Sequence, residues 1–551
     1  MKTSRLPLIA MLAACAPLLA ACGGGGEQKA LRPPCPAGRL CLEYGNSGEP
    51  TTLDPQKANA SWEFGIVSDF MVGLTDNDAA AKTIPGMATH WEQSPDGLVW
   101  TFHLRDGQWS DGTPVTAADF VFGLQRLFDP KTASGQAAQF YAIKNSRAVN
   151  GGKLPLSALG VTAPDAHTVR IELEHPWPIL ADNAAAPPMS PSPRHVVAKW
   201  GDAWSQPAHF VGNGPYLPKS WTLGDKVVVE KNPRYFDAAK VCLDRISFYP
   251  TTDAVSAERR VKRGELDLNT VVQSNRVNFL RRPDQMPGYV RVYPYVGAVF
   301  LTFNLKSVPA LRDVRVRQAL SMAIDRDFIV NKLFRGGQKP AYSFLPPGML
   351  DYDGRARTYW ATWPLERRQA EARRLLAAAG YGPKHPLKLE IRHRNTADPT
   401  LYTPAVQADW RSIGVKAQLL STEVQIAYQS YEAGDFEVAD AGWGGGSDAM
   451  GFLFLQRSDT GSQNYGGYKN LRYDALLDAA DHERDLKRRM AYLGQAEQIV
   501  LDDAPIAPVY TIASKNLVNP NVTGWVDNNF DTHKLRFLCF RDAAQRRAGR
   551  G

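Results

Sequence analysis

Cysteine is the residue whose chemistry this sequence constrains most. Six cysteines are present: Cys15 lies in an N-terminal leader, Cys22 directly follows it, and the other four form an even set, Cys35, Cys41, Cys242 and Cys539. In an exported chain an even set is typical of disulfides, because thiols are oxidised outside the cytoplasm. We expect Cys35 to pair with Cys41 and Cys242 with Cys539, although the sequence alone allows other pairings. No histidine neighbours these cysteines at ligand spacing, so we predict neither a metal site nor a cofactor.

The leader has the composition of a bacterial lipoprotein signal. Lys2 and Arg5 give it a positive start, and an apolar run follows that is too short to span a membrane stably. The next four residues, LAAC, resemble a lipobox, which makes Cys22 the diacylated first residue of the mature protein. The alternative is an ordinary signal peptide with a small-residue cleavage site.

The sequence lacks the motifs that would indicate an enzyme. It contains no G-x-S-x-G elbow, no H-E-x-x-H pair and no Walker loop. His90, His103, His393 and His482 are scattered, and ordinary surface or core positions explain each of them. Carboxylates and tryptophans are plentiful enough for a glycosidase, but the separation of a catalytic pair cannot be obtained from the sequence. We therefore expect no enzyme and keep an exported hydrolase as the weaker alternative.

Length and composition indicate a large globular protein with more than one core. The chain has 551 residues and 60.8 kDa; 44% of the residues are hydrophobic and 22% are charged. Its formal charge of +8 becomes +6 once the leader is removed, since Lys2 and Arg5 leave without an acid. Spread over so large a surface, this charge is a weak argument for nucleic acid. We expect no nucleic-acid partner.

Local patterns predict alternating strands and helices. From Leu98 to Arg105 apolar residues take every second position, which is the period of a strand with one buried face. Thr116, with Asp119 three residues later, favours the start of a helix, and Asp129-Pro130 ends it. Further helices are expected at 313–324, 325–330, 366–379 and 490–504, and strands at 226–230 and 387–391. Such units fit α/β lobes.

One long segment has the appearance of a family signature: residues 91–130, WEQSPDGLVWTFHLRDGQWSDGTPVTAADFVFGLQRLFDP. It resembles the solute-binding proteins that serve oligopeptide and dipeptide ABC importers. The resemblance extends, in order, to EPTTLDPQKA (49–58), GNGPY (212–216), EKNPRYFD (230–237), DVRVRQALSMAIDRDFIV (313–330) and DDAPIAPVY (502–510). These segments cover nearly all of the chain after the leader, and the ordered set is specific.

The resemblance implies an α/β, two-lobed periplasmic-binding-protein fold with an extra third domain and a ligand cleft between the lobes. Lobe I is expected to be discontinuous, with an inserted lobe II and an opposing lobe III. The expected division of the chain is a signal peptide at 1–21, a flexible tether at 22–34, lobe I at 35–70, 193–295 and 513–541, lobe II at 71–192, lobe III at 296–512, and a disordered tail at 542–551. Hinges are expected where the chain crosses between lobes, near Pro193, Tyr295 and Ile512.

Two stretches correspond by position to the walls of the ligand cleft. The first, residues 58–64, contains the candidate ligand-binding residues Asn59, Ser61 and Trp62. The second, residues 438–455, contains the candidates Asp440, Trp443, Gly444, Gly445, Gly446 and Asp448. A glycine-rich loop lets the ligand's main chain approach closely. The alternative is that the glycines form only a flexible loop and that Asp440 is a solvated charge.

The second stretch departs from the family. Oligopeptide binders commonly carry VARAGWCADYN here, with an Arg before Ala-Gly-Trp and an Asp that pairs with the peptide amine. In this chain those positions are Asp440 and Gly446, so Asp448 replaces the acid only if the loop shifts. The usual Cys is Gly444 and its usual partner matches Gly297, so both halves of that disulfide are absent. We expect Asp440 or Asp448 to bind a cationic ligand group.

The function implied by the resemblance is that of a receptor for import. A lipid-anchored protein outside the cytoplasm, facing the periplasm or the cell surface, would capture short peptides or peptide-like solutes. Closure of its lobes on the ligand would present it to the permease subunits of an ABC importer. We expect it to act as a monomer. The alternative is a receptor or sensor of the same fold for another solute, such as a metal chelate, haem or a murein peptide.

Overall fold

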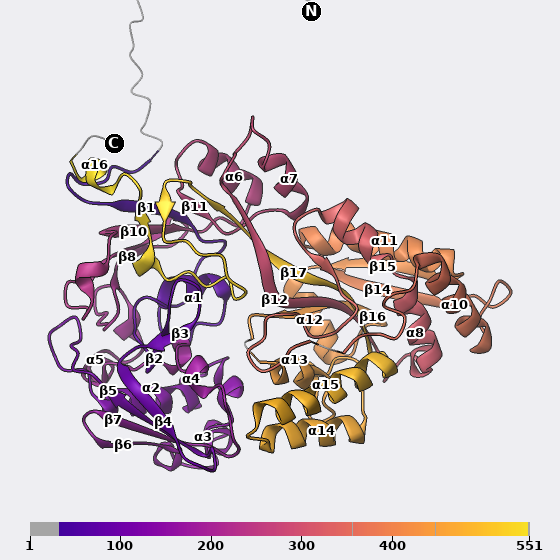
Figure 1. Ribbon diagram of the computed structural model, residues 1–551, viewed down its shortest axis with the longest axis horizontal. Helices are drawn as coiled ribbons and strands as arrows, with labels where there is room; N and C mark the ends of the chain where they lie inside the picture. The colour runs from indigo at the N-terminus through magenta and orange to yellow at the C-terminus, as the bar shows by residue number, and fades with distance from the viewer. Residues whose placement is uncertain (1–31, 355, 447, 549–551) are drawn as a thin grey trace, which may run out of the picture.

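A mixed sheet of eleven strands runs through the part of the molecule that the structure describes, residues 32–354, 356–446 and 448–548. In the computed structural model the strands follow the order β15-β14-β16-β12-β17-β11-β1-β10-β9-β8, with β13 paired to β17. The two central strands, β12 (Val290–Phe303) and β17 (Ile506–Val518), are long and pair antiparallel. Figure 1 shows them crossing from a body that contains lobes I and II to a second body, lobe III.

Lobe I supplies the half of the large sheet that begins with the first strand of the chain. Its strands are β1 (Cys41–Gly45), β8 (Tyr216–Thr222), β9 (Lys226–Lys231), β10 (Arg245–Tyr249) and β11 (Leu268–Asn269). Its helices are α1 (Ser61–Val67), α5 (Arg194–Trp200), α6 (Ala254–Lys262) and α7 (Val277–Leu280). At the start of α1 the Glu63 carboxylate accepts hydrogen bonds from the backbone N–H of Asn59, Ala60 and Thr51. Burial disfavours its charge, yet these bonds lower the pKa of Glu63 below its ordinary value.

Lobe II is built on a four-stranded antiparallel sheet of its own, in the order β4-β5-β7-β6. Its strands are β2 (Thr75–Asn77), β3 (Thr83–Pro85), β4 (Ala88–Gln93), β5 (Val99–Leu104), β6 (Val161–Asp165) and β7 (Thr168–Glu172), and its helices are α2 (Ala117–Phe128), α3 (Ser146–Asn150) and α4 (Leu180–Asn183). In β5, Trp100, Phe102 and Leu104 are buried, which confirms the alternation expected from the sequence. The predicted cap of α2 is also confirmed, since the N–H and hydroxyl of Thr116 donate to Asp119 at 2.8 and 3.0 Å.

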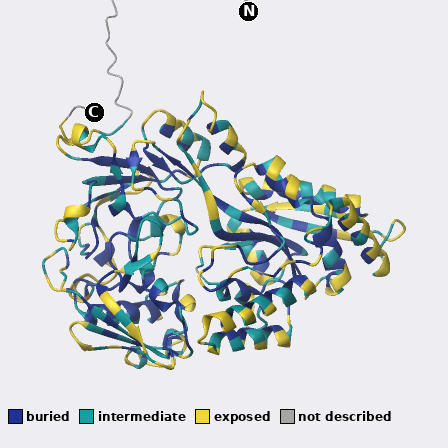
Figure 2. Ribbon diagram, viewed as in Figure 1, coloured by how far each residue is buried: buried dark blue, intermediate teal, exposed yellow. Residues whose placement is uncertain are grey.

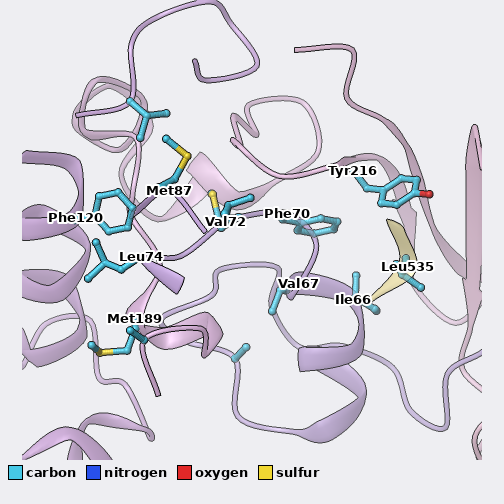
Figure 3. Close-up of a cluster of buried hydrophobic side chains, with 14 of the residues drawn as sticks. Ile66, Val67, Phe70, Val72, Leu74, Met87, Phe120, Met189, Tyr216 and Leu535 are labelled. Carbon is cyan, nitrogen blue, oxygen red and sulfur yellow. The ribbon is translucent and has the colours of Figure 1, made fainter. Parts of the chain in front are cut away.

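Lobes I and II share one hydrophobic core. Ile66 of lobe I and Leu74 and Phe120 of lobe II belong to the same buried cluster, together with Leu535 from near the C-terminus. Figure 3 shows these side chains packed around Phe70, where the chain passes from lobe I into lobe II. Because close-packed interiors resist shear, the two lobes form one body.

Lobe III holds the other half of the large sheet between two cores. Its strands are β13 (Lys339–Pro340), β14 (Lys388–Arg394), β15 (Lys416–Thr422) and β16 (Val438–Gly444). Its helices are α8 (Val314–Ala323), α9 (Arg326–Phe328), α10 (Leu365–Ala378), α11 (Ala397–Ser412), α12 (Val424–Ala433), α13 (Met450–Leu453), α14 (Leu471–His482) and α15 (Leu486–Asp503). The side chains of Asp313 and Asp325 accept backbone hydrogen bonds at the starts of α8 and α9, as predicted. In Figure 2 the buried residues follow the strands, while exposed residues lie on the outer faces of helices such as α14.

The chain crossings expected near Tyr295 and Ile512 fall inside the paired strands β12 and β17. Pro294 pairs with Ala513 and Ala298 pairs with Thr511, so three residues of β12 lie opposite the single residue Ile512. Such a bulge interrupts the ladder and bends the strand. We expect the two bodies to rotate relative to each other at this point.

The segment 526–537, which we call the C-terminal strap, contacts both bodies. The Asn529 carbonyl accepts a hydrogen bond from the Val296 N–H at 2.8 Å, and Phe530 packs against a lobe III core. Eight residues after the start of the strap, Lys534 Nζ donates to the Ser68 carbonyl of lobe I at 2.7 Å. The strap therefore provides a second connection between the bodies, beside β12 and β17.

The ends of the described chain correct two expectations. The tail, expected to be disordered over 542–551, forms helix α16 (Ala543–Arg547) beyond a small hairpin of β18 (Val522–Thr523) and β19 (Cys539–Phe540). Arg547 fixes it by donating to the carbonyls of Gly38 and Cys242, each at 2.9 Å. Arg32, expected in the flexible tether, forms an ion pair with Asp267 at 2.6 Å. These partners are distant in sequence, so local composition could not indicate that the tail and the residues near Arg32 are ordered.

Residues 1–31 and 549–551 lie outside the described residues, and with them the expected signal peptide and the lipidation site Cys22. Among the described helices none is long and apolar enough to cross a membrane.

Within residues 32–548, two disulfides join the cysteines in the expected pairs. Cys35 is bonded to Cys41, with 5.7 Å between their Cα atoms, and Cys242 is bonded to Cys539, with 5.4 Å between theirs. The sequence separations are 6 and 297 residues. The second bond fixes β19, and with it the C-terminal end of the chain, to lobe I.

We predict that the two disulfides differ in their effect on stability. In the chain-entropy description a longer closed loop stabilises more, about 6 kcal/mol for a loop of this length against about 2 kcal/mol for the short one. The double variant Cys242→Ser/Cys539→Ser should therefore melt well below the matched control Cys35→Ser/Cys41→Ser. Thermal unfolding by circular dichroism measures both, and equal melting temperatures would contradict the expectation.

Candidate functional site

The carboxyl ends of three parallel strands meet on one edge of lobe III. β14 runs parallel to both β15 and β16, and the three strands end at Arg394, Thr422 and Gly444. The chain passes outward from β14 to β15 through α11, and then back across β14 to β16 through α12. Because such crossovers are right-handed, the two helices cover opposite faces of the sheet. Ligand sites in open α/β sheets lie outside carboxyl ends where the strand order reverses in this way.

Asp440 and Arg394 form an ion pair at this edge. Asp440 is fully buried, and its carboxylate accepts hydrogen bonds from Arg394 Nε at 2.8 Å, Arg394 Nη2 at 3.2 Å and the Tyr402 hydroxyl at 2.6 Å. Arg394 Nη1 donates to the Tyr428 hydroxyl at 3.0 Å. Burial opposes the charge of Arg394, but the Asp440 carboxylate raises its pKa far above the ordinary value. Tyr402 on α11 and Tyr428 on α12 thus hold the pair from two helices.

This arrangement gives Asp440 a role different from the expected one. A free acid was expected to bind a cationic ligand group, whereas the described carboxylate already accepts hydrogen bonds from the side chain and backbone N–H of Arg394 and from the Tyr402 hydroxyl. Breaking a buried pair leaves an uncompensated charge, which is strongly unfavourable. Asp440 therefore positions Arg394.

The glycine loop that follows β16 is covered by Tyr295. Gly297 of β12 lies directly opposite Gly444 of β16, at the two positions matched to the family's cysteines. A Cβ at Gly444 would lie 2.9 Å from the Tyr295 ring, and one at Gly445 would lie 3.0 Å from its hydroxyl. Close approach of this ring therefore requires glycine at both positions. Burial, with the Asp531 charge second, raises the pKa of Tyr295 to about 12, so the hydroxyl remains a donor at neutral pH.

Trp443 lies beneath the end of the loop. It is half-buried and packs against the lobe III core that contains Phe452. A Cβ at Gly446 would lie 3.9 Å from the Phe452 ring and 4.0 Å from Trp443 Nε1. Gly446 and Trp443 are therefore close neighbours, and an apolar surface lies under the glycine backbone.

Asp448 caps helix α13. Its Oδ1 accepts a hydrogen bond from the Gly451 N–H at 2.7 Å, and the adjacent Ala449 N–H donates to Asp351 at 2.8 Å. Asp351 is in turn paired with Arg489 at 3.2 Å. Burial, followed by the nearby Asp351 charge, raises the pKa of Asp448 to about 6. The expected role of binding a ligand cation thus competes with an established capping role.

The residues of the first wall lie on lobe I around the start of α1. Asn59, Ser61 and Trp62 are all exposed. The Asn59 side-chain carbonyl accepts a hydrogen bond from Gln136 Nε2 of lobe II, and Trp62 Nε1 donates to the Glu49 carbonyl at 3.1 Å. The structure keeps these three residues together and holds them on the opposite body from Trp443 and the glycine loop.

Three residues of this region were not among the ligand-binding candidates expected from the sequence: Arg394, Tyr402 and Tyr295, the last of which was expected only as a hinge position. Arg394 is 46 residues before its partner Asp440, and Tyr402 is 38 residues before it. One signal in the sequence could have indicated a cationic partner: position 440 carries an Asp where the family commonly has an Arg. A buried acid requires a cation in contact with it. Among the described residues no group of three or more His, Cys, Asp or Glu side chains is arranged to hold a metal ion.

Lobes II and III meet directly beside a cavity of about 320 Å³. It is lined by the turn between β4 and β5, by Pro176 and Pro178, and by the start of α15. Across this junction Arg484 Nη1 donates to the Pro95 carbonyl at 2.6 Å, and the rings of His175 and His482 are 6.1 Å apart. The hydrogen bond joins residues 389 apart in the chain, so opening of the two bodies must break it.

We predict that Arg484→Ala shifts the ligand-free protein toward an open arrangement. The arginine supplies the direct hydrogen bond between lobes II and III, and its removal destabilises the form in which they meet. Small-angle X-ray scattering should give a larger radius of gyration than for the parent protein. Arg488→Ala is the matched control, because Arg488 lines the same cavity but pairs with Glu483 of its own lobe at 3.0 Å. An unchanged radius for Arg484→Ala would contradict the prediction.

We predict that Asp448→Asn stabilises the protein at pH 7 and not at pH 4. A carboxyl group whose folded pKa is raised contributes stability below its unfolded pKa, near 4, and loses it as pH rises through the folded pKa of about 6. Asparagine keeps the capping oxygen without the charge. Allowing for solvent screening, we expect a gain of about 1 to 2 kcal/mol at pH 7. Urea unfolding between pH 4 and pH 8 measures it, with the fully exposed Asp106 changed to Asn as the control; a pH-independent effect would contradict the assignment.

Comparison with known proteins gives consistent matches over most of the chain. The family model of bacterial extracellular solute-binding proteins, family 5 Middle, matches residues 82–464. The periplasmic oligopeptide-binding protein OppA of Salmonella typhimurium is 36% identical over 89% of this chain and 90% of its own length. The probable deoxycholate-binding periplasmic protein YgiS of Escherichia coli is 35% identical over 96% of this chain and 97% of its own length.

The fold matches solved structures equally well. The murein tripeptide binding protein MppA of Escherichia coli superposes with a TM-score of 0.80 at 35% identity, covering 91% of this chain and 98% of that protein. This agreement shows that the two proteins share the mixed α/β, two-lobed fold. The chain therefore belongs to the bacterial extracellular solute-binding proteins of family 5 and has their two-lobed periplasmic-binding-protein fold.

Proposed function

We propose that this protein is a receptor outside the cytoplasm that captures peptides or peptide-like solutes between its two bodies and delivers them to the permease subunits of an ABC importer. The observation that carries the proposal is the family match, which covers residues 82–464 and extends in the oligopeptide-binding relative to 89% of the chain. The family relatives are binding proteins, and we propose no catalytic step for this chain.

The proposed ligand contacts come from both bodies. Asn59, Ser61 and Trp62 lie exposed on lobe I, and the backbone of the loop 444–446 lies with Trp443 on lobe III. Backbone N–H and C=O groups bind a peptide main chain whatever its side chains, and tryptophan adds apolar contact area. Asp440 and Asp448 act indirectly, the first by holding Arg394 and the second by capping α13.

The proposed cycle is closure about β12 and β17. The bulge at residues 295–297 supports this location for the hinge, because a strand bends most easily where its ladder is interrupted. A ligand that contacts both bodies stabilises the closed form, and the permease distinguishes closed from open receptors. The hydrogen bond from Arg484 to Pro95 belongs to the form in which lobes II and III meet.

We also propose that the protein acts as a monomer held at a bacterial membrane by lipid on Cys22. The support is the leader sequence, with its positive start, its short apolar run and the residues LAAC. A lipid anchor keeps the receptor near its permease and leaves both bodies free to move.

A second candidate is a receptor of the same fold for a non-peptide solute. It is favoured by the relative named as a probable deoxycholate-binding protein, which matches 96% of this chain. A murein peptide is an intermediate case, since one structural relative is named for a murein tripeptide. The altered residues at 440 and 446 are compatible with either solute.

The test is ligand-dependent stability of the purified protein. A mixed library of peptides from two to six residues is incubated with the full chain, retained peptides are identified by mass spectrometry, and each is then assayed by thermal unfolding. A specific ligand at about a hundred times its dissociation constant should add about 2.7 kcal/mol to the free energy of unfolding. Stabilisation by deoxycholate alone would select the second candidate, and stabilisation by neither would refute both. In parallel, Cys22→Ser should move the protein from the membrane fraction to the soluble fraction.

A further inference from the structure

The acids at the carboxyl edge of lobe III are all engaged within the described protein. Asp440 accepts hydrogen bonds from the side chain and backbone N–H of Arg394 and from the Tyr402 hydroxyl. Glu423, which directly follows β15, accepts the N–H groups of Gln425 and Ile426 at the start of α12. Asp448 accepts the Gly451 N–H. Each of these carboxylates therefore already accepts hydrogen bonds from protein donors.

Arg394, in contrast, retains donor capacity. A guanidinium carries five N–H groups, and the hydrogen bonds to Asp440 and Tyr428 use three of them. The side chain is 17% exposed, although it belongs to a salt bridge whose acid is fully buried. It is thus the charged group of the pair that reaches the surface of this edge.

The backbone of β16 leaves space beside this guanidinium. Besides Asp440, the residue of β16 beside it is Gly442, where a Cβ would lie 3.9 Å from Arg394 Nη2. Glycine at this position places no side chain over the guanidinium. The next residue on the strand is Trp443, which offers an apolar surface, and β16 ends one residue later.

Arg394 lies at the point of the sheet where open α/β sheets in general bind their ligands. It is the last residue of β14, and β14 and β16 are the neighbouring strands between which the strand order reverses. In open α/β sheets the crevice outside the carboxyl ends at such a point holds the ligand. Tyr428 on α12 accepts a hydrogen bond from the guanidinium directly, and Tyr402 on α11 donates to its partner Asp440, so both helices help to fix the guanidinium at this crevice.

We propose that Arg394 is the specificity-determining residue of this edge and that the receptor takes solutes presenting a carboxylate there rather than an ammonium group. The inference rests on the proposed function, since it concerns the ligand of the same receptor. A carboxylate matches the planar donors of a guanidinium, and charge-assisted hydrogen bonds of this kind are stronger than neutral ones. The carboxylate could belong to a peptide or to an amphiphilic organic acid.

The experiment is a competition between ligand forms on the full-length protein. One peptide library of three to six residues is prepared in three forms: acetylated with a free carboxylate, acetylated with a terminal amide, and amidated with a free amine. Retained forms are quantified by mass spectrometry. Deoxycholate and its methyl ester are compared in a separate arm, which distinguishes an organic acid from a peptide as the source of the carboxylate. We expect the carboxylate form to be retained about tenfold over either other form, the ratio that corresponds to one charge-assisted hydrogen bond.

Variants assign the preference to Arg394. The double variant Arg394→Gln/Asp440→Asn removes both charges together, so that no buried acid is left unpaired and the fold is retained. It should bind carboxylate and amide forms equally. Asp440→Asn alone frees the guanidinium and should increase the preference for the carboxylate. The control is Arg392→Gln, which lies two residues earlier on β14 and pairs with Asp435 at 3.1 Å; the tenfold ratio should persist.

Three outcomes would overturn the proposal in different ways. Equal retention of all forms by the parent protein would refute the carboxylate preference and leave the receptor function standing. If the double variant still prefers the carboxylate form, the assignment of this preference to Arg394 is refuted, while the preference itself stands. No retention of any peptide form and no stabilisation by deoxycholate or its ester would refute the proposed function, and the inference with it.

Discussion

The antiparallel pairing of β12 with β17 is the interaction on which the rest of the structure depends. β16 pairs with β12 on one side, and β11 pairs with β17 on the other, so both halves of the large sheet are attached through this ladder. From Val296 to Phe303 every residue of β12 is buried, which anchors the strand in lobe III. The three-residue bulge opposite Ile512 then concentrates flexibility at one place. A single sheet with an interruption at this point can in this way serve two bodies that move.

Within this scaffold, buried charges decide what the ligand edge can recognise. Two tyrosines from different helices hydrogen-bond to the pair of Arg394 and Asp440 and help to offset its burial. Oligopeptide binders commonly carry an Arg and an Asp at the positions of Asp440 and Gly446, so the charge at position 440 is reversed in this chain. Fold and function class are therefore shared with the relatives, whereas ligand chemistry is set by a few side chains at one strand end.

The elements of this chain were predictable where the determining residues are close in sequence. The buried face of β5 follows from alternate residues, and the start of α2 follows from Thr116 and Asp119, which are three residues apart. The expected disulfide partners and the two-lobed fold came from the cysteine count and from ordered family motifs. The environment of Asp440 was not predictable, because Arg394 reaches it through the pairing of β14 with β16. That residues 543–547 form an ordered helix was not predicted for the same reason, since the partners of Arg547, Gly38 and Cys242, are hundreds of residues away.

The C-terminal strap has a consequence for how the protein is made. Leu535 belongs to the core shared by lobes I and II, Lys534 bonds to Ser68, and Cys539 is bonded to Cys242. Lobe I therefore lacks part of its interior until the last residues of the chain have been synthesised. A nascent chain emerging from the ribosome holds its first lobe incomplete throughout elongation. That delay suits a protein that must be threaded through a secretion channel before it folds, because the final contacts and both disulfides can then form on the far side of the membrane.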